Sequence, residues 1–490
     1  MTTPGSPGTE LSAHLRFGGI VLDQGSGGSY DHIDPATGHL NAVVPLGGRE
    51  EIDRAAKSAA AAFVEWSSWA PTARREALLR LSQLITEHED EFVTIAAREN
   101  GTPVATGPRL CEIARDWIGY YAGWADKLEG QVSRSFASGG ELTYSQPEPF
   151  GVIGVIITWN VPLISLCMKA VPALAAGNTV LIKPSELTPF TPDLFARLCV
   201  EAGIPEGVVN CVPGNAEAGD ALVAHPLVQK ITFTGGPATA RKIMATCAAN
   251  LKPSVMELGG KSASVIFPDA DLDIAAKNTV YLGLGALSGQ GCLIGSRVLV
   301  HESVYDEVVA KLIATAEQLT IGNPTDPATR FGPVINSVAC ERILGIVERA
   351  ARDGAHIALG GERLGGEFAG GSYVAPTIVT GVDPTSELAQ TELFGPVLSV
   401  IRFSEEDEAL EIANGTAFGL AAYLHTRDIT RALRMVDKLE AGSVYVNGAK
   451  TTPAHSPFGG RGESGFGREG GRVGIDEFVR PKTVSIASLA

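Results

Sequence analysis

The sequence predicts an α/β protein with two doubly wound domains, each built on a parallel sheet. The first observation is that short apolar segments alternate with helical segments between residues 152 and 257. The second is a similar alternation between residues 298 and 446. The third is that the chain has 490 residues, of which 44% are hydrophobic, enough to bury the cores of several domains. Strands that alternate with helices are typical of a parallel sheet covered on both faces.

Predicted strands and helices follow each other along both regions. The first region has predicted strands at residues 152–157, 179–182, 208–212, 230–233 and 254–257, with helices at 162–176, 192–202, 216–224 and 238–249. The second region has predicted strands at 298–300, 356–359, 398–403, 421–425 and 444–446, with helices at 303–318 and 337–353. A domain boundary is expected near residues 258–261.

The remaining segments have different patterns. Helical periodicity covers residues 50–69 and 72–99, a break with Gly and Pro covers 101–107, and the first dozen residues are expected to form a flexible tail. Residues 131–148 are predicted to be two polar strands around Ser138, Gly139 and Gly140, and residues 482–490 a terminal strand.

The charge and the cysteines exclude several classes of protein. The formal net charge of −16 does not suit a nucleic-acid partner or an anionic membrane. No long uncharged apolar stretch and no basic-then-apolar leader occur. Seven scattered cysteines without a Cys-x-x-Cys pair argue against a disulfide scaffold or a metal site. We therefore expect a cytoplasmic protein that holds no metal.

Polar and Gly-rich residues follow successive predicted strands. These segments are Thr158 to Pro162, Lys183 to Glu186, Thr234 to Pro237 and Glu257 to Lys261. Because parallel strands place ligands outside their carboxyl ends, the four segments indicate a nucleotide crevice. Each also has an ordinary interpretation. The Gly pair is often only a turn, the charges often face water, and Asn160 is a helix N-cap in many such places.

Cys292 lies in the run Gly289-Gln290-Gly291-Cys292. A cysteine in such a run is often an inert buried thiol, but it can be a nucleophile in a tight loop. No histidine motif accompanies it, and His455 near a Gly-rich loop is expected at the surface. The segment from Gly465 to Gly470 fits G-x-G-x-x-G, but no predicted strand precedes it, so we interpret it as a loop.

Taken together, these motifs resemble the NAD(P)-dependent aldehyde dehydrogenase superfamily. The matching pieces are residues 34–38, 158–162, 183–186, 233–236, 257–262, 289–292, 392–397 and 457–460, in the family's order and spacing. The resemblance runs from about residue 32 to 484. It implies two Rossmann-like domains, with the cofactor bound by residues 1–130 and 150–257 and the catalytic domain at 258–465. It also implies a small β arm, residues 131–149 and 477–490, for homo-oligomerisation as a dimer or tetramer.

The resemblance implies covalent catalysis. Cys292 would attack the aldehyde carbon and form a thiohemiacetal, while the Asn160 amide and the Cys292 backbone N–H stabilise the oxyanion. Oxidation with NAD would leave a thioester, which Glu257 would hydrolyse by activating water. Lys169 and Glu469 match positions linked to proton relay or to structural support.

The resemblance also implies the cofactor contacts. Lys183 and Glu186 match the pair that binds the adenosine ribose, and the Glu186 charge favours NAD over NADP because it repels a 2′-phosphate. The other implied cofactor residues are Thr158, Trp159, Ser185, Gly235, Gly236, Leu258, Gly259, Glu392 and Phe394. Thr158 replaces the usual Pro, Gly236 the usual Ser, and Ala240 a frequent Gly.

The residues implied for the substrate are Val161, Met168, Ala286 and Phe458. The first three are small or flexible where relatives often carry aromatic residues, which predicts a wide funnel and a bulky hydrophobic aldehyde: aromatic, terpenoid or long-chain. Other hypotheses are a dehydrogenase that passes the acyl group to coenzyme A, a silent protein on the same fold, and a thiol esterase. Glu257 argues against the first, and the complete set of Cys292, Asn160 and Glu257 against the second.

Overall fold

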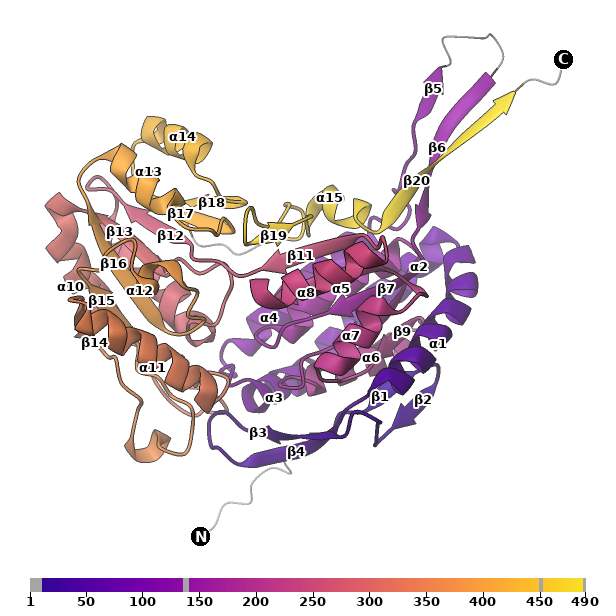
Figure 1. Cartoon of the computed structure of the whole chain (residues 1–490), viewed down its shortest axis with the longest axis horizontal. Coiled ribbons are helices and arrows are strands. Elements are labelled where there is room, and N and C mark those ends of the chain that lie inside the picture. The colour runs from indigo at the N-terminus through magenta and orange to yellow at the C-terminus, as the bar shows by residue number, and fades with distance from the viewer. Residues whose placement is uncertain (1–10, 135–140, 449–452, 488–490) are drawn as a thin grey trace.

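The computed structural model describes residues 11–134, 141–448 and 453–487. Within them, two large sheets with helices on their faces form the body of the molecule, and a narrow three-stranded arm projects from it (Figure 1). The larger sheet has the strand order β19-β11-β10-β7-β8-β9-β1-β2, and the smaller one β14-β15-β16-β13-β12-β17-β18. These observations confirm the predicted α/β class.

The first alternating region forms the centre of the eight-stranded sheet. Its parallel strands are β7 (Val152–Ile156), β8 (Thr179–Lys183), β9 (Val209–Cys211), β10 (Val228–Gly235) and β11 (Ser254–Leu258). β7 and β8 are buried along their whole length, which explains their continuous apolar sequence. Thr234 pairs with Glu257 and Gly235 with Leu258, so the carboxyl ends of these strands lie at one edge.

The second region forms the seven-stranded sheet. Its strands are β12 (Ala263–Ile266), β13 (Arg297–His301), β14 (His356–Leu359), β15 (Thr377–Thr380), β16 (Val397–Phe403), β17 (Ala421–His425) and β18 (Ser443–Val446). β12 and β15 were absent from the prediction. Each has only four residues, yet β12 lies at the centre, between β13 and β17, because tertiary pairing decides the state of so short an apolar run.

Helices cover both sheets. They are α1 (Arg49–Ser68), α2 (Pro71–Glu87), α3 (Glu89–Glu99), α4 (Gly107–Ala122), α5 (Pro162–Ala175), α6 (Phe190–Glu201), α7 (Ala216–Ala224), α8 (Pro237–Ala249), α9 (Leu272–Val280), α10 (Tyr305–Ala316), α11 (Ser337–Arg352), α12 (Glu387–Gln390), α13 (Glu406–Asn414), α14 (Ile429–Lys438) and α15 (Gly471–Asp476).

Two helix predictions are wrong. The pattern at 72–99 forms two helices, because His88 (φ −108°, ψ 20°) leaves helical geometry between α2 and α3. α4, which begins with Gly107 and Pro108, was missed, and its first residue, Gly107, was assigned to the preceding break at 101–107. Pro lacks an N–H and suits the first turn of a helix, so this Gly-Pro pair begins α4.

The chain ends also differ from the prediction. Leu11, expected in the flexible tail, is buried in the core, and four short strands follow it: β1 (Leu15–Phe17), β2 (Ile20–Leu22), β3 (Ser29–Ile33) and β4 (Leu40–Pro45). The segment interpreted as a loop contains β19 (Gly465–Phe466), which pairs antiparallel with β11. A two-residue strand lacks any periodicity that a sequence could show.

The arm consists of β5 (Val132–Arg134), β6 (Glu141–Pro149) and β20 (Val479–Ala487), in the order β20-β6-β5. It stands away from the two sheets in Figure 1. The turn expected at Ser138 to Gly140 lies outside the described residues. β20 begins three residues earlier than predicted, because Val479 pairs with Pro149 at the base of the arm. In the described ranges, no helix is both long and apolar enough to span a membrane.

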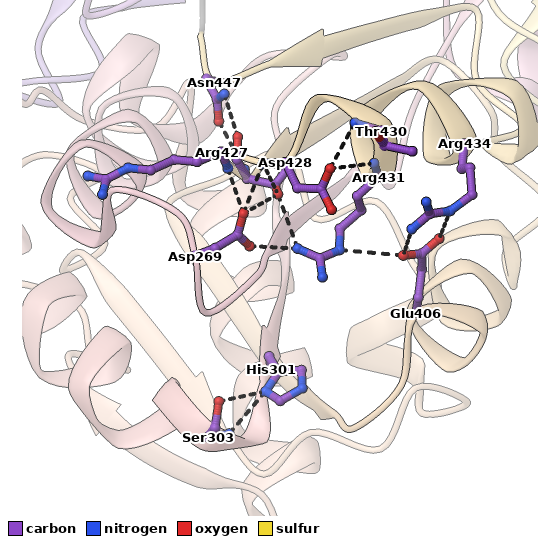
Figure 2. Close-up of polar contacts among 11 residues, drawn as sticks. Asp269, His301, Ser303, Glu406, Arg427, Asp428, Thr430, Arg431, Arg434 and Asn447 are labelled. Carbon is purple, nitrogen blue, oxygen red and sulfur yellow. Dashed lines mark hydrogen bonds and ion pairs between the residues drawn. The ribbon is translucent and has the colours of Figure 1, made fainter.

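Asp269 organises the loop between β17 and α14 (Figure 2). Its carboxylate accepts hydrogen bonds from Thr426 Oγ1 at 2.7 Å and from the Arg427 and Asp428 backbone N–H groups at 2.8 and 3.0 Å. Arg431 Nη1 also donates to it, at 2.7 Å. These donors hold the pKa of Asp269 below its usual value, although partial burial alone would raise it.

Candidate active site

A cavity of about 320 Å³ opens at the carboxyl ends of the strands of the larger sheet. Most of the predicted site residues line it: Thr158, Trp159, Asn160, Val161, Met168, Gly235, Gly236, Glu257, Leu258, Gly259, Cys292, Glu392, Phe394, Phe458 and Glu469. Residues 158–161 follow β7, 235–236 end β10, and 257–259 end β11. The topology of the sheet thus brings together segments that are far apart in the chain.

Three further residues line the cavity. Thr234 belongs to the predicted crevice segment Thr234 to Pro237 but had no role of its own, and Ser165 and Arg342 were not predicted. Ser165 lies one turn after Val161 on α5, so helical spacing could have found it. Arg342 lies on α11, and no sequence signal connects it with the strand ends. Burial lowers the pKa of the Arg342 guanidinium below its usual value, although the nearby Glu392 charge acts in the opposite direction.

Five predicted residues do not line this cavity. Lys169 is buried in α5, Lys183 is the last residue of β8, and Ser185 and Glu186 follow that strand. Ala286 begins the short 3₁₀ turn η2 (Ala286–Gly289), outside the cavity lining.

The loop that carries Cys292 follows a π-helical turn, η1 (Tyr281–Gly285), and η2. Leu287 and Ser288 have φ angles of 52° and 51°, a strained conformation for residues with a Cβ atom. Ser288 Oγ donates to the Gly332 carbonyl at 2.8 Å and accepts from the Gly332 N–H at 3.1 Å, which holds the strained turn. Of the seven cysteines, all of them described, six are buried and Cys292 alone is half-buried.

The surroundings of Cys292 favour the neutral thiol in the absence of ligands. Burial raises its pKa well above 9, and the carboxyl groups of Glu257, Glu392 and Glu469 raise it further. A thiolate at this position therefore requires added positive charge or donors in the cavity.

Asn160 approaches the Cys292 loop from the end of β7. Its Nδ2 donates to the Gln290 carbonyl at 2.9 Å, and one of its two amide hydrogens remains for another acceptor. Its Oδ1 has no partner among the described residues. The Gln290 side chain is also held, since its Oε1 accepts from the Ile335 N–H at 2.8 Å.

Glu257 ends β11 with a buried side chain, and its Oε1 has no partner within the described part of the chain. Burial raises the pKa of Glu257 well above 4.5, and the Glu469 charge raises it further, whereas Lys169 and Arg468 lower it. Lys169 forms an ion pair with Glu469 and donates to Thr232 Oγ1 at 3.2 Å. A buried carboxyl group whose pKa is raised in this way can act as a general base.

Glu392 and Gly259 both line the cavity, and Gly260 follows Gly259 in the chain. The Gly260 N–H donates to Glu392 Oε1 at 2.9 Å. A Cβ atom at Gly259 would lie 2.1 Å from Glu392 Oε2, so a side chain there would displace the Glu392 carboxylate. Burial raises the pKa of Glu392 to about 7, although the Gly260 N–H and the charges of Lys261 and Arg342 lower it. Next to it, the rings of Phe394 and Trp159 pack edge to face at 5.2 Å.

Lys183, at the end of β8, and Glu186, just after it, lie close together. Lys183 Nζ is 4.0 Å from the Glu186 carboxylate and donates to the Pro184 carbonyl at 2.9 Å. Burial lowers the pKa of Lys183, whereas the Glu186 charge raises it. Ser185 Oγ accepts from the Leu187 N–H at 3.2 Å and stabilises the turn. The Glu186 side chain is 38% exposed and can accept hydrogen bonds from a hydroxyl-bearing ligand.

The amino end of α8 borders the same cavity. Gly236 is its N-cap residue and has no side chain to bond the first N–H groups of the helix. No atom lies within 4 Å of the position that a Gly236 Cβ would occupy. Open space before free N–H groups at a helix start suits a phosphate. Across the described residues, no group of three or more His, Cys, Asp or Glu side chains is arranged to hold a metal.

Solved structures of known proteins share this architecture. An aldehyde dehydrogenase from Bacillus cereus, solved as an NAD⁺ complex, is 36% identical over 97% of this chain and 96% of its own, with a TM-score of 0.93. HpcC from Thermus thermophilus is 38% identical over 98% and 94% of the two chains, with a TM-score of 0.94. A betaine aldehyde dehydrogenase variant from Staphylococcus aureus, in complex with NAD⁺, is 32% identical over 98% and 97%, with a TM-score of 0.95.

The model of the aldehyde dehydrogenase family matches residues 22–484 of this chain, a span that contains the smaller sheet, the larger sheet except β1 and most of β2, and every residue of the cavity. The match confirms the resemblance seen in the motifs. The chain belongs to the aldehyde dehydrogenase family.

Proposed function

We propose that this protein oxidises an aldehyde to the carboxylic acid with NAD, through covalent intermediates on Cys292. The observation that carries the proposal is the shared cavity of Cys292, Asn160 and Glu257: one accessible thiol, one amide with a free hydrogen, and one buried carboxyl without a partner. A nucleophile, an oxyanion donor and a base within one cavity are what acyl chemistry requires.

Cys292 is the nucleophile. Its thiolate attacks the aldehyde carbon, and the former carbonyl oxygen becomes the oxyanion of a thiohemiacetal. The Asn160 Nδ2 and the Cys292 backbone N–H donate to that oxygen, and one such donor lowers a barrier by about 2.7–4 kcal/mol. Oxidation leaves the substrate on Sγ as a thioester.

Glu257 is the base for hydrolysis. It takes a proton from water, the hydroxide oxygen attacks the thioester carbon, and the C–S bond breaks to release the acid and the thiol. Its unpartnered Oε1 is free to accept that proton. Lys169 and Glu469 form an ion pair, and their charges shift the pKa of Glu257 in opposite directions: Glu469 raises it and Lys169 lowers it.

The site fits a dinucleotide cofactor on three observations: the open space at Gly236 before α8, the close packing of Gly259 on Glu392, and the polar pair Lys183 and Glu186. A bound dinucleotide would supply the acceptor for the hydride of the substrate carbon. Trp159, Gly235 and Gly236 would border the pyrophosphate. Thr158, Leu258 and Phe394, with Glu392, would hold the nicotinamide end.

NAD is favoured over NADP because the Glu186 carboxylate would repel a 2′-phosphate. The Bacillus cereus and Staphylococcus aureus relatives were solved with NAD⁺, which supports the same choice.

The substrate is proposed to be a bulky hydrophobic aldehyde: aromatic, terpenoid or long-chain. Val161, Met168 and Phe458 give the cavity an apolar wall, and two of them are aliphatic and small or flexible. Ala286, the fourth residue of the substrate prediction, does not line the cavity and carries no part of this argument.

The domain roles follow the two sheets. We assign cofactor binding to residues 1–130 and 150–257, catalysis to 258–465, and association to the arm at 131–149 and 477–490. The arm exposes Val132, Leu142 and Ile486, at 77%, 50% and 52%, a surface that a second copy of the chain would cover in a dimer or tetramer. Seven cysteines without a disulfide fit the cytoplasm.

The test compares wild type, Cys292→Ala and, as a matched control, Cys199→Ala on the distant helix α6. Each is given NAD with benzaldehyde, decanal, a terpenoid aldehyde or acetaldehyde, and reduced cofactor is measured by absorbance. We expect the bulky aldehydes to give the larger kcat/KM, and only Cys292→Ala to lose the activity. A preference for acetaldehyde would remove the substrate proposal alone, and absence of reduction with all four would remove the function. Formation of an acyl-coenzyme A product would favour the acylating alternative.

A further inference from the structure

Asn100 is a buried residue outside the cavity lining, and it bonds to the backbone that carries Asn160. Its Nδ2 donates to the Trp159 carbonyl and to the Asn160 carbonyl, each at 3.1 Å. Its Oδ1 accepts from the Thr102 N–H at 3.2 Å and from Thr102 Oγ1 at 2.8 Å. Because a backbone N–H can only donate and a carbonyl can only accept, these contacts fix the orientation of the amide.

The turn after α3 also contacts the segment that supports the nucleophile loop. A Cβ atom on Gly101 would lie 2.6 Å from the Pro333 ring, so the turn and the segment are in close contact. The Pro333 carbonyl accepts from Gln290 Nε2 at 3.4 Å, and the Gln290 carbonyl accepts from Asn160 Nδ2 at 2.9 Å. The Asn160 residue is therefore held on two sides: Asn100 bonds to its backbone, and Gln290, which contacts Pro333, accepts from its side chain.

We propose that Asn100 is a positioning residue for the reaction: it holds the Trp159 and Asn160 peptides so that the Asn160 amide meets the oxygen of a substrate bound at Cys292. The inference rests on the proposed function, in which that amide is an oxyanion donor. Two hydrogen bonds from one buried, immobilised amide fix both the position and the tilt of this backbone, whereas a single bond would leave it free to rotate. A displacement of about 1 Å in such a donor lowers rates by about 100-fold.

The chain contains a matched asparagine that has only a structural role. Asn178 is fully buried, donates to the Ala173 and Phe478 carbonyls at 3.1 and 2.9 Å, and accepts from the Gly151 N–H at 3.0 Å. It precedes β8 and thus lies at the amino ends of the strands, opposite the cavity. Replacement of either asparagine by alanine removes one side-chain amide, with two N–H donors and one acceptor oxygen. The two variants therefore differ mainly in where the lost amide lies in the fold.

The experiment is a double-mutant cycle between Asn100→Ala and Asn160→Ala, with kcat measured at saturating NAD and aldehyde and corrected for the folded fraction. We expect Asn160→Ala to lower kcat by about 100–1,000-fold and Asn100→Ala by about 10–100-fold. The double variant should resemble Asn160→Ala within about threefold, because Asn100 acts through an amide that is no longer there. Asn178→Ala should lower the melting temperature and leave kcat unchanged, alone or with Asn160→Ala.

Two results would overturn the inference. One is an additive cycle, in which Asn100→Ala lowers kcat of the Asn160→Ala enzyme by the same factor as it lowers that of wild type. The other is an Asn100→Ala enzyme whose kcat per folded molecule equals that of Asn178→Ala. The same cycle on hydrolysis of an activated ester, which needs Cys292 and the oxyanion donors but no cofactor, separates the two proposals. If the wild-type enzyme oxidises no aldehyde but Asn100 and Asn160 are coupled in ester hydrolysis, the proposed function is overturned and the positioning role of Asn100 is supported.

Discussion

Lys169 on α5 forms an ion pair with Glu469, and the Lys169 side chain is 1% exposed. The two residues meet because Glu469 pairs with Phe458 across a short antiparallel bridge, its N–H donating to the Phe458 carbonyl at 2.7 Å. The Glu469 charge raises the pKa of Glu257, and the Lys169 charge lowers it. The pair therefore links the C-terminal segment to the Glu257 carboxyl group, the proposed base.

We predict that Lys169→Met lowers the free energy of unfolding by about 3–5 kcal/mol, because it leaves the Glu469 carboxylate buried without its cation. Urea unfolding measures the change. Lys482→Met is the matched control: Lys482 pairs with Glu148 on the arm, where the lysine is 55% exposed, and its loss should cost at most about 1 kcal/mol. Equal losses in the two variants would contradict the prediction.

The raised pKa of Glu257 predicts the pH dependence of hydrolysis. The carboxyl is protonated at low pH and becomes a base only as pH rises through its raised value, so kcat should increase with pH. Glu257→Gln should lower kcat by about 100–10,000-fold, remove this rise, and accumulate a thioester on Cys292. Mass spectrometry of the quenched enzyme detects the thioester; rapid turnover in Glu257→Gln at every pH would exclude Glu257 as the base.

The same shift affects stability. The folded state binds the Glu257 proton more tightly than the unfolded state, where the ordinary pKa is 4.5. The folded state is therefore destabilised relative to the unfolded state as the pH rises from 4.5 through the raised pKa of Glu257 in the folded protein. Glu257→Gln has no such loss, so its free energy of unfolding should increase relative to wild type between acid and neutral pH. A constant difference across that range, measured in urea, would show that the folded pKa is not raised.

Cys292 should react slowly with iodoacetamide at neutral pH in the free enzyme, because burial and three carboxyl groups raise its pKa. The rate should increase with pH and should increase again when NAD⁺ is added, since the positive nicotinamide favours the thiolate. Peptide mapping identifies the modified thiol, and Cys199, fully buried, is the internal control. Fast labelling at neutral pH without cofactor would contradict the prediction.

An added side chain should have opposite effects at Gly236 and at Gly259, two glycines that line the cavity. Gly236→Ser should be tolerated, because open space surrounds the site, and should stabilise α8 by a few tenths of a kcal/mol (roughly 0.3) as an N-cap. Gly259→Ala should weaken NAD binding by about 10-fold or more, because its Cβ would displace the Glu392 carboxylate. Isothermal titration with NAD measures both; equal affinities in the two variants would contradict this expected difference.

The sequence predicted the elements whose signal is local. β7 and β8 are continuous apolar runs because both of their faces are buried. The polar residues at their carboxyl ends could be grouped because parallel strands place those ends at one edge. The same reasoning found Asn160, Glu257 and most of the cavity lining.

The rest depends on contacts between distant segments. β12 is short, and only its neighbours β13 and β17 make it a strand. Asn100 bonds to carbonyl groups 59 and 60 positions away, and a carbonyl is present at every residue, so no pattern marks the partners. Ala286 precedes a strained turn, whose course after the helix no periodicity describes.

The return of the chain to the larger sheet has a consequence for biosynthesis. β19 pairs with β11, and Phe458 and Glu469 reach the cavity only through this late segment. A nascent chain that has already exposed Cys292, Asn160 and Glu257 still lacks one wall of the site and the partner of Lys169. In the order of translation, the Cys292 thiol thus precedes Phe458 and Glu469, two of the residues that line the same cavity.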